Sequence, residues 1–167
     1  MRLRCPLSTA ICALALTTGC ARTPPPPPAK AAGPSLRPLS DDVRQAYLAY
    51  WDAWLKANRT SNPDEPSLAE HATSPQLAVL RANLAAARQQ HRVTRGTVGH
   101  RLEGMEGAGD ARWVVDCIDL DHWLLYDAVT DEPVDQLVDK PLQLAVFALR
   151  RHGGGWWVTS SQVTSGC

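Results

Sequence analysis

An aspartate and a histidine are the residues of this sequence with the types and positions best suited to acid–base chemistry. Asp116 lies in the run Trp113-Val114-Val115-Asp116-Cys117-Ile118-Asp119, whose β-branched and aromatic composition is typical of a strand. Side chains alternate along a strand, so Asp116 shares a face with Val114 and Ile118, a setting suited to a general base or acid. His100 on a neighbouring predicted strand is the candidate partner. The alternative is a strand-end Asp116 that accepts backbone or arginine hydrogen bonds.

Four aromatic residues form a second candidate site on a predicted helix. Tyr47, Tyr50, Trp51 and Trp54 recur at spacings of three and four residues, which places them on one face of a helix. Such a face can line a pocket for an apolar ligand or stack on sugar rings. It can equally be ordinary hydrophobic core, which is the commoner use of an aromatic stripe.

Other clusters of polar residues indicate turns rather than sites. Asp119, Asp121 and His122 are spaced like a solvated turn, and Gly153-Gly154-Gly155 lacks the helix and Lys/Ser of a phosphate loop. We therefore expect no metal ion and no cofactor. Without residues 1–19, fifteen basic residues face seventeen acidic ones, a balance that does not favour binding to nucleic acid.

The elements that would position these residues change in type along the chain. Ser40 is a candidate N-cap for a helix that ends near Asn58, a short helical turn follows over 67–71, and Ser74-Pro75 begins another helix. Later runs have the length and composition of strands, separated by Gly- and Asp-containing turns; they are 93–102, 112–119, 122–128, 142–151 and 156–163. Helices followed by consecutive hairpins predict an α+β domain over 39–167, with two or three helices packed on a curved antiparallel sheet of about five strands.

This order of elements, with the ending Gly155-Trp156-Trp157-Val158, resembles the nuclear-transport-factor-2-like (cystatin-like) superfamily. The resemblance covers residues 40–167 and implies a cone-shaped α+β fold with a hydrophobic pocket between the first helix and the sheet. Some members of the superfamily are isomerases or dehydratases that use a pocket Asp or His, and many only bind ligands. The fold alone does not choose between them.

The N-terminal residues have the pattern of an export signal. Arg2 and Arg4 precede an uncharged apolar stretch over 6–16, which is shorter than the ~20 residues of a membrane-spanning helix. Leu16-Thr17-Thr18-Gly19-Cys20 resembles the lipobox of bacterial lipoproteins, although Thr17 stands where Leu is commonest. The resemblance implies cleavage after residue 19 and lipidation of Cys20. The alternatives are a secretory signal cut after Ala15 and an N-terminal helix that is not removed.

A linker and a cysteine pair agree with export. Residues 20–38 contain five consecutive prolines, Pro24 to Pro28, and few apolar side chains, as in an extended polyproline spacer. Five cysteines are present; Cys5 and Cys12 lie in the signal and Cys20 would carry lipid. Cys117 and Cys167 remain, and we predict that they form a disulfide in an oxidising compartment.

The sequence thus predicts a lipid-anchored protein on the extracytoplasmic face of a cell membrane, of unknown activity. The first hypothesis is a non-enzymatic module that binds a small apolar ligand or a cell-envelope partner. The second is an isomerase- or dehydratase-like enzyme, which requires Asp116 and His100 to face one cavity. The third is a structural interaction protein that dimerises through its sheet.

The anchor is tested by removing the thiol that the lipid would modify. We expect Cys20→Ser to move the protein from the membrane fraction to the soluble extracytoplasmic fraction, because a serine hydroxyl cannot replace the thiol in lipidation. Immunoblotting of separated fractions measures this, with Cys12→Ser as a matched control that stays with the membranes. A Cys20→Ser protein that remains membrane-bound would contradict the anchor.

Overall fold

The computed structural model describes residues 36–134 and 142–167, all within the compact unit Gly33–Cys167. The predicted signal peptide, Cys20 and most of the proline linker therefore lie outside the described residues. Arg37, inside the predicted linker, already pairs with Met105 through two backbone hydrogen bonds of 2.9 and 2.8 Å. No helix in the described residues is long and apolar enough to cross a membrane.

Three helices come first in the part of the chain that the structure describes, and their bounds follow the sequence pattern. They are α1 (Asp41–Asn58), α2 (Ser67–His71) and α3 (Gln76–Gln89). Ser40 has the extended backbone of an N-cap but its side chain makes no capping hydrogen bond, while Asp41 and Asp42 lie in the first turn, where negative charge favours the helix. The apolar face of α1 is buried, as its periodicity predicts.

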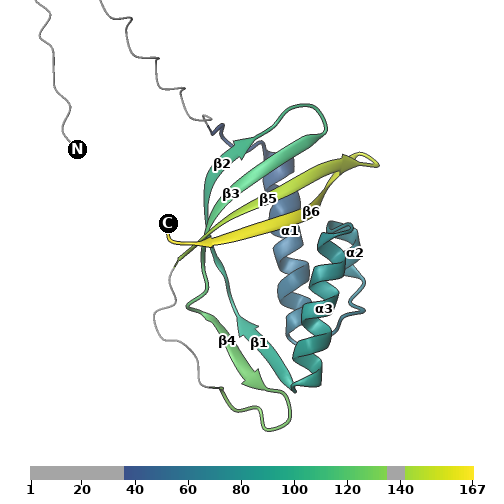
Figure 1. The fold of residues 1–167 in the computed structure, drawn as a ribbon, viewed down its shortest axis with the longest axis vertical. Helices are drawn as coiled ribbons and strands as arrows, with labels where there is room; N and C mark the ends of the chain where they lie inside the picture. The colour runs from purple at the N-terminus through teal and green to yellow at the C-terminus, as the bar shows by residue number, and fades with distance from the viewer. Residues whose placement is uncertain (1–35, 135–141) are drawn as a thin grey trace, which may run out of the picture. The chain divides into compact units, whose positions relative to one another are not determined.

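Within the described residues, six antiparallel strands follow and form two sheets (Figure 1). The larger has the order β2-β3-β5-β6, made of β2 (Gly99–Glu106), β3 (Ala111–Asp119), β5 (Gln143–His152) and β6 (Gly155–Ser165). The smaller pairs β1 (Arg92–Gly96) with β4 (Trp123–Asp127). This arrangement of helices and antiparallel strands confirms the predicted α+β class.

The predicted strand over 93–102 is in fact two strands, β1 and β2, separated by a sharp change of direction. Gly96 has a φ of +106°, a backbone conformation that other residues rarely adopt, and a Cβ there would lie 1.9 Å from the carbonyl oxygen of His122. On the opposite chain segment, Asp119 accepts a hydrogen bond from the backbone N–H of Asp121 at 2.9 Å, as expected of a turn. Both segments therefore bend together, and the β1–β4 pair continues the β2–β3 pair in a new direction.

The hydrophobic core lies between the helices and one face of the larger sheet. It combines buried side chains of α1, α2 and α3 with those of β3, β5 and β6; the largest of those with almost no exposed surface are Tyr47, Leu68, Leu84, Ile118 and Leu149. On β3, Val114, Asp116 and Ile118 are buried on this face, whereas Trp113 on the other face is 41% exposed. The predicted alternation of β3 is thus confirmed.

The predicted disulfide between Cys117 and Cys167 is present, with the two Cα atoms 6.0 Å apart. It joins β3 to a residue 50 positions later, beyond the end of β6. A cross-link over such a long segment stabilises chiefly by restricting the unfolded chain.

We therefore expect the double variant Cys117→Ser/Cys167→Ser to lose about 4 kcal/mol of unfolding free energy, the chain-entropy value for a loop of this length. Urea denaturation of residues 36–167 followed by circular dichroism measures the loss. The wild-type protein in reductant should unfold at the same urea concentration as the variant. If reductant leaves the wild-type midpoint unchanged, the bond does not form in solution.

Candidate functional site

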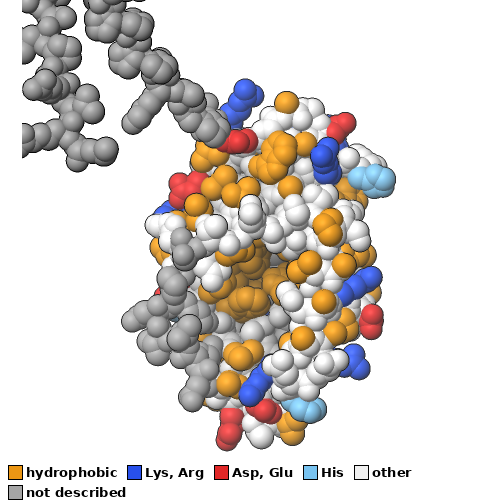
Figure 2. Space-filling view, in the orientation of Figure 1, with side chains coloured by type: hydrophobic (Ala, Val, Ile, Leu, Met, Phe, Trp, Pro, Cys, Tyr) orange, Lys and Arg blue, Asp and Glu red, His pale blue; other side chains and the backbone are white. Residues whose placement is uncertain are grey.

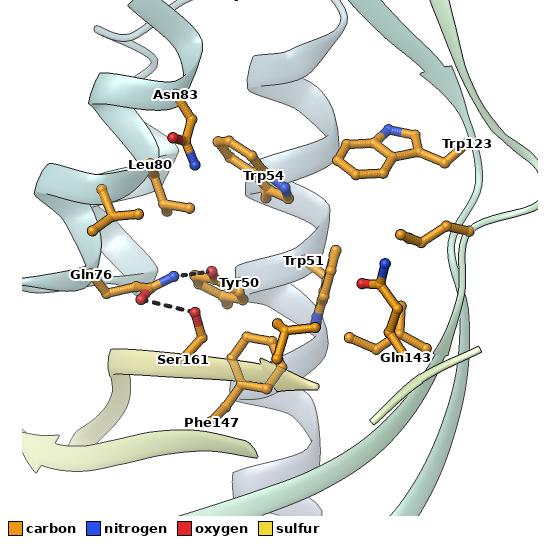
Figure 3. Close-up of a pocket in the computed structure, with 14 residues that line it drawn as sticks. Tyr50, Trp51, Trp54, Gln76, Leu80, Asn83, Trp123, Gln143, Phe147 and Ser161 are labelled. Atoms are coloured by element: carbon orange, nitrogen blue, oxygen red, sulfur yellow. Dashed lines mark hydrogen bonds between the residues drawn. The ribbon is translucent and has the colours of Figure 1, made fainter. Parts of the chain in front are cut away.

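An aromatic cavity lies between α1, α3 and the sheets (Figures 2 and 3). Its volume is about 170 Å³. The wall combines three residues of α1 with side chains from α3, β3, β4, β5, β6 and the turn after β3; the members are Tyr50, Trp51, Trp54, Gln76, Val79, Leu80, Asn83, Ile118, Leu120, Trp123, Gln143, Phe147, Ser161 and Val163. Figure 2 shows the hollow opening on the surface, with hydrophobic side chains at its base.

The cavity runs from an exposed mouth to a buried base. Val79 on α3 and Val163 on β6 are 50% and 51% exposed and lie at the mouth. Tyr50, Trp51 and Phe147 are buried at the base, where their ring centroids lie 5.8–6.1 Å apart in edge-to-face contacts. Such interlocked rings form a rigid apolar surface.

A row of hydrogen bonds crosses one side of this wall. The Ser161 hydroxyl donates to Gln76 Oε1 at 3.2 Å, and Gln76 Nε2 donates to the Tyr50 hydroxyl oxygen at 2.7 Å (Figure 3). Burial raises the pKa of Tyr50 well above the usual tyrosine value, so its hydroxyl keeps its proton at neutral pH. The wall thus has ordered polar groups within a mainly aromatic surface.

Asp116 lies in a separate buried cluster, two residues before the cavity-lining Ile118 on β3. Its Oδ2 accepts a hydrogen bond from the Tyr47 hydroxyl at 2.7 Å and lies 2.6 Å from Nδ1 of His100. Burial, and then the adjacent Asp116 carboxylate, raise the pKa of Tyr47, which therefore remains a donor. Trp51 separates this cluster from the cavity, with its ring centroid 4.9 Å from that of His100.

Two buried polar atoms near this cluster lack partners among the described residues. Asp116 Oδ1 makes no hydrogen bond, and neither does the Trp51 indole N–H, although the indole lies near the Tyr47 hydroxyl and acts to lower the pKa of Tyr47. Unpaired buried polar groups lower the stability of the fold. The two contacts of Asp116 Oδ2, with Tyr47 and His100, are therefore the ones that stabilise this buried side chain. Asp116 is 0% exposed and does not line the cavity, so a ligand bound there would not contact its carboxylate.

The structure divides the residues predicted to act into these two groups. Asp116 and His100 are brought together, on the same face of the sheet, but neither lines the aromatic cavity. Tyr50, Trp51 and Trp54 lie on the cavity wall, whereas Tyr47, predicted to join them, points to Asp116 because it lies about one helical turn nearer the start of α1.

Sequence reasoning missed several residues of the wall. Gln76, Trp123, Phe147 and Ser161 come from four different elements, and none has a spacing that relates it to α1. Trp123 packs 6.5 Å from Trp54, ring centroid to ring centroid, only because the β1–β4 pair bends toward α1. The sequence places Trp123 near the start of a predicted strand, but it does not indicate that Trp123 packs against Trp54.

Comparison with protein-family models and with curated protein sequences finds no match to this chain. Among solved structures, the chain is similar to the intermembrane space region of chloroplast protein ARC6, with a TM-score of 0.58 and 13% identity over 77% of this chain and 100% of that one. It is also similar to an NTF2-like protein from Cytophaga hutchinsonii, with a TM-score of 0.46 and 14% identity over 76% of this chain and 99% of that one.

A third similar structure is an NTF2-like protein of unknown function from Prochlorococcus marinus, with a TM-score of 0.46 and 15% identity over 77% of this chain and 95% of that one. The similarity to the ARC6 region is one of fold, and two structures described as NTF2-like are among the others to which the chain is similar. At such low identity the likeness says nothing about activity. Function has to be argued from the cavity and from the Asp116 cluster.

The role of the Asp116 cluster can be tested through Tyr47. We expect Tyr47→Phe to lower the unfolding free energy by about 2 kcal/mol, because it leaves a buried carboxylate with one partner fewer. Tyr126→Phe is the matched control; that hydroxyl has no hydrogen bond among the described residues, and its loss should change stability by less than about 0.5 kcal/mol. Equal effects of the two substitutions in urea denaturation would contradict the anchoring role.

Proposed function

We propose that this chain is an extracytoplasmic protein, anchored to a membrane through lipidated Cys20, whose α+β domain binds a small and largely apolar ligand. The observation that supports the binding role is the aromatic cavity with its open mouth and buried base. Ligand sites in proteins are typically concave, mainly apolar and provided with a few placed polar groups, and this cavity has all three properties.

The size of the cavity limits the ligand. A volume of about 170 Å³ is close to that of an engineered apolar cavity known to bind benzene, and it is below the range of sites for drug-sized molecules. The ligand is therefore about the size of one substituted ring. Five aromatic side chains on the wall would contact the faces and edges of such a ring; they are Tyr50, Trp51, Trp54, Trp123 and Phe147.

The location outside the cytoplasm is supported by two features that are independent of the cavity. The Cys117–Cys167 disulfide fits an oxidising compartment, since cytosolic thiols are normally kept reduced. The apolar stretch before Cys20 and the prolines after it suit export, lipidation and a spacer between membrane and domain.

A binding role fits the geometry better than the isomerase- or dehydratase-like alternative. That alternative requires Asp116 and His100 to face a cavity, but they are paired with each other, and Asp116 is also bonded to Tyr47. A general base has to reach the proton that it abstracts, and Trp51 lies between His100 and the cavity.

Closing the mouth tests the binding role. We expect Val79→Trp to weaken binding of toluene at least tenfold, because a large ring at this half-exposed position on α3 would enter the mouth without disturbing the core. Ligand-observed NMR titration of residues 36–167 with toluene measures the dissociation constant. The substitution should leave thermal stability nearly unchanged.

Ala78→Trp is the matched control, since Ala78 is also exposed on α3 but does not line the cavity. We expect this variant to bind toluene like the wild type. If both variants bind equally, the ligand does not enter through this mouth. If the wild-type protein binds no toluene, the binding role fails, and a cell-envelope partner becomes the better candidate.

A further inference from the structure

The polar side of the cavity has unused hydrogen-bonding capacity. The Tyr50 oxygen accepts from Gln76, and no hydrogen bond of the described residues uses the proton of the Tyr50 hydroxyl. Gln76 Oε1 accepts from Ser161, which fixes the orientation of the amide and directs Nε2 toward Tyr50. A hydroxyl that accepts one hydrogen bond and retains its proton is a donor ready for a ligand oxygen.

The charges of the wall restrict the ligand further. None of the described residues that line the cavity is an Asp, Glu, Lys, Arg or His. An ionised ligand group would lose its hydration there without gaining a counter-charge, which is strongly unfavourable. A neutral oxygen acceptor needs only one good donor, and Tyr50 supplies it at the buried base beside Trp51 and Phe147.

From this combination we infer that the cavity binds an uncharged, single-ring aromatic compound with a carbonyl oxygen, which accepts a hydrogen bond from the Tyr50 hydroxyl. The ring packs among the aromatic side chains and the carbonyl points to the row Ser161–Gln76–Tyr50 (Figure 3). This inference rests on the proposed binding function and adds the chemical class of the ligand to it.

Three probes of nearly the same shape separate the possibilities. Acetophenone is a neutral aromatic ketone, α-methylstyrene replaces its carbonyl oxygen by a CH₂ group, and benzoate is an anion of similar size. Their dissociation constants are measured by ligand-observed NMR on wild-type residues 36–167 and on Tyr50→Phe. Comparing two proteins with each probe removes the difference in hydration between the probes themselves.

We expect Tyr50→Phe to weaken acetophenone binding about fivefold, the net value of one hydrogen bond, and to leave α-methylstyrene binding unchanged. Benzoate should not bind detectably to either protein. Unchanged α-methylstyrene binding also shows that the variant keeps the shape of the cavity.

Two results would overturn the inference while leaving the binding function intact. One is an equal effect of Tyr50→Phe on acetophenone and α-methylstyrene, which would mean that the hydroxyl does not contact the carbonyl. The other is benzoate binding as tight as that of acetophenone. If no probe binds to the wild type, the proposed function and this inference are both wrong.

Ser161→Ala provides a second variant in case Tyr50→Phe does not fold. Ser161 is exposed, so its substitution leaves the core intact, but it removes the donor that orients the Gln76 amide. We expect a loss of about twofold in acetophenone binding and no loss for α-methylstyrene. Ser160→Ala, on the neighbouring exposed residue outside this cavity, should change neither; equal losses from both serine variants would count against the row.

Discussion

The hydrogen bond between Tyr47 and Asp116 is the contact on which the position of the first helix depends. It joins α1 to the middle of β3 over 69 residues of sequence, and its acceptor is a fully buried carboxylate. A buried carboxylate needs donors, so the helix cannot rotate away without a large cost. With Tyr47 fixed, the helical repeat directs Trp51 and Trp54 to the cavity wall on the same side. The polar cluster is therefore structural support for the aromatic site.

A second constraint shapes the opposite wall. Gly96 permits the bend between β1 and β2 because any larger residue would collide with the backbone at His122. This bend turns the β1–β4 pair so that Trp123 lies edge-on to Trp54. The disulfide at Cys117, on the same strand as Asp116 but on its other face, fixes the chain after β6 to the sheet. The cavity walls thus depend on one polar contact and one glycine, while the disulfide holds the end of the chain to the sheet.

Local patterns predicted much of this arrangement. The aromatic face of α1 and the alternation around Asp116 follow from the spacing of residues close in sequence. The pairing of Cys117 with Cys167 follows from counting the cysteines that remain after the signal segment and Cys20 are set aside. The bend at Gly96 was missed because an isolated glycine in a strand pattern also fits a straight strand. The wall residues Gln76, Trp123 and Ser161 were missed because they come from elements far apart in the sequence. Only tertiary packing brings these elements together, and residue spacing along the chain does not predict it.

The six tryptophans allow a direct test of the central claim that the aromatic cavity is the ligand site. Trp51, Trp54 and Trp123 line the cavity, whereas Trp113, Trp156 and Trp157 lie elsewhere. In ¹⁵N-labelled protein, each indole N–H gives its own NMR signal, assigned by single Trp→Phe substitutions. Titration with acetophenone should shift the three cavity signals in a saturable manner and leave the other three in place. Shifts confined to Trp113, Trp156 or Trp157, or no shifts at all, would contradict the account.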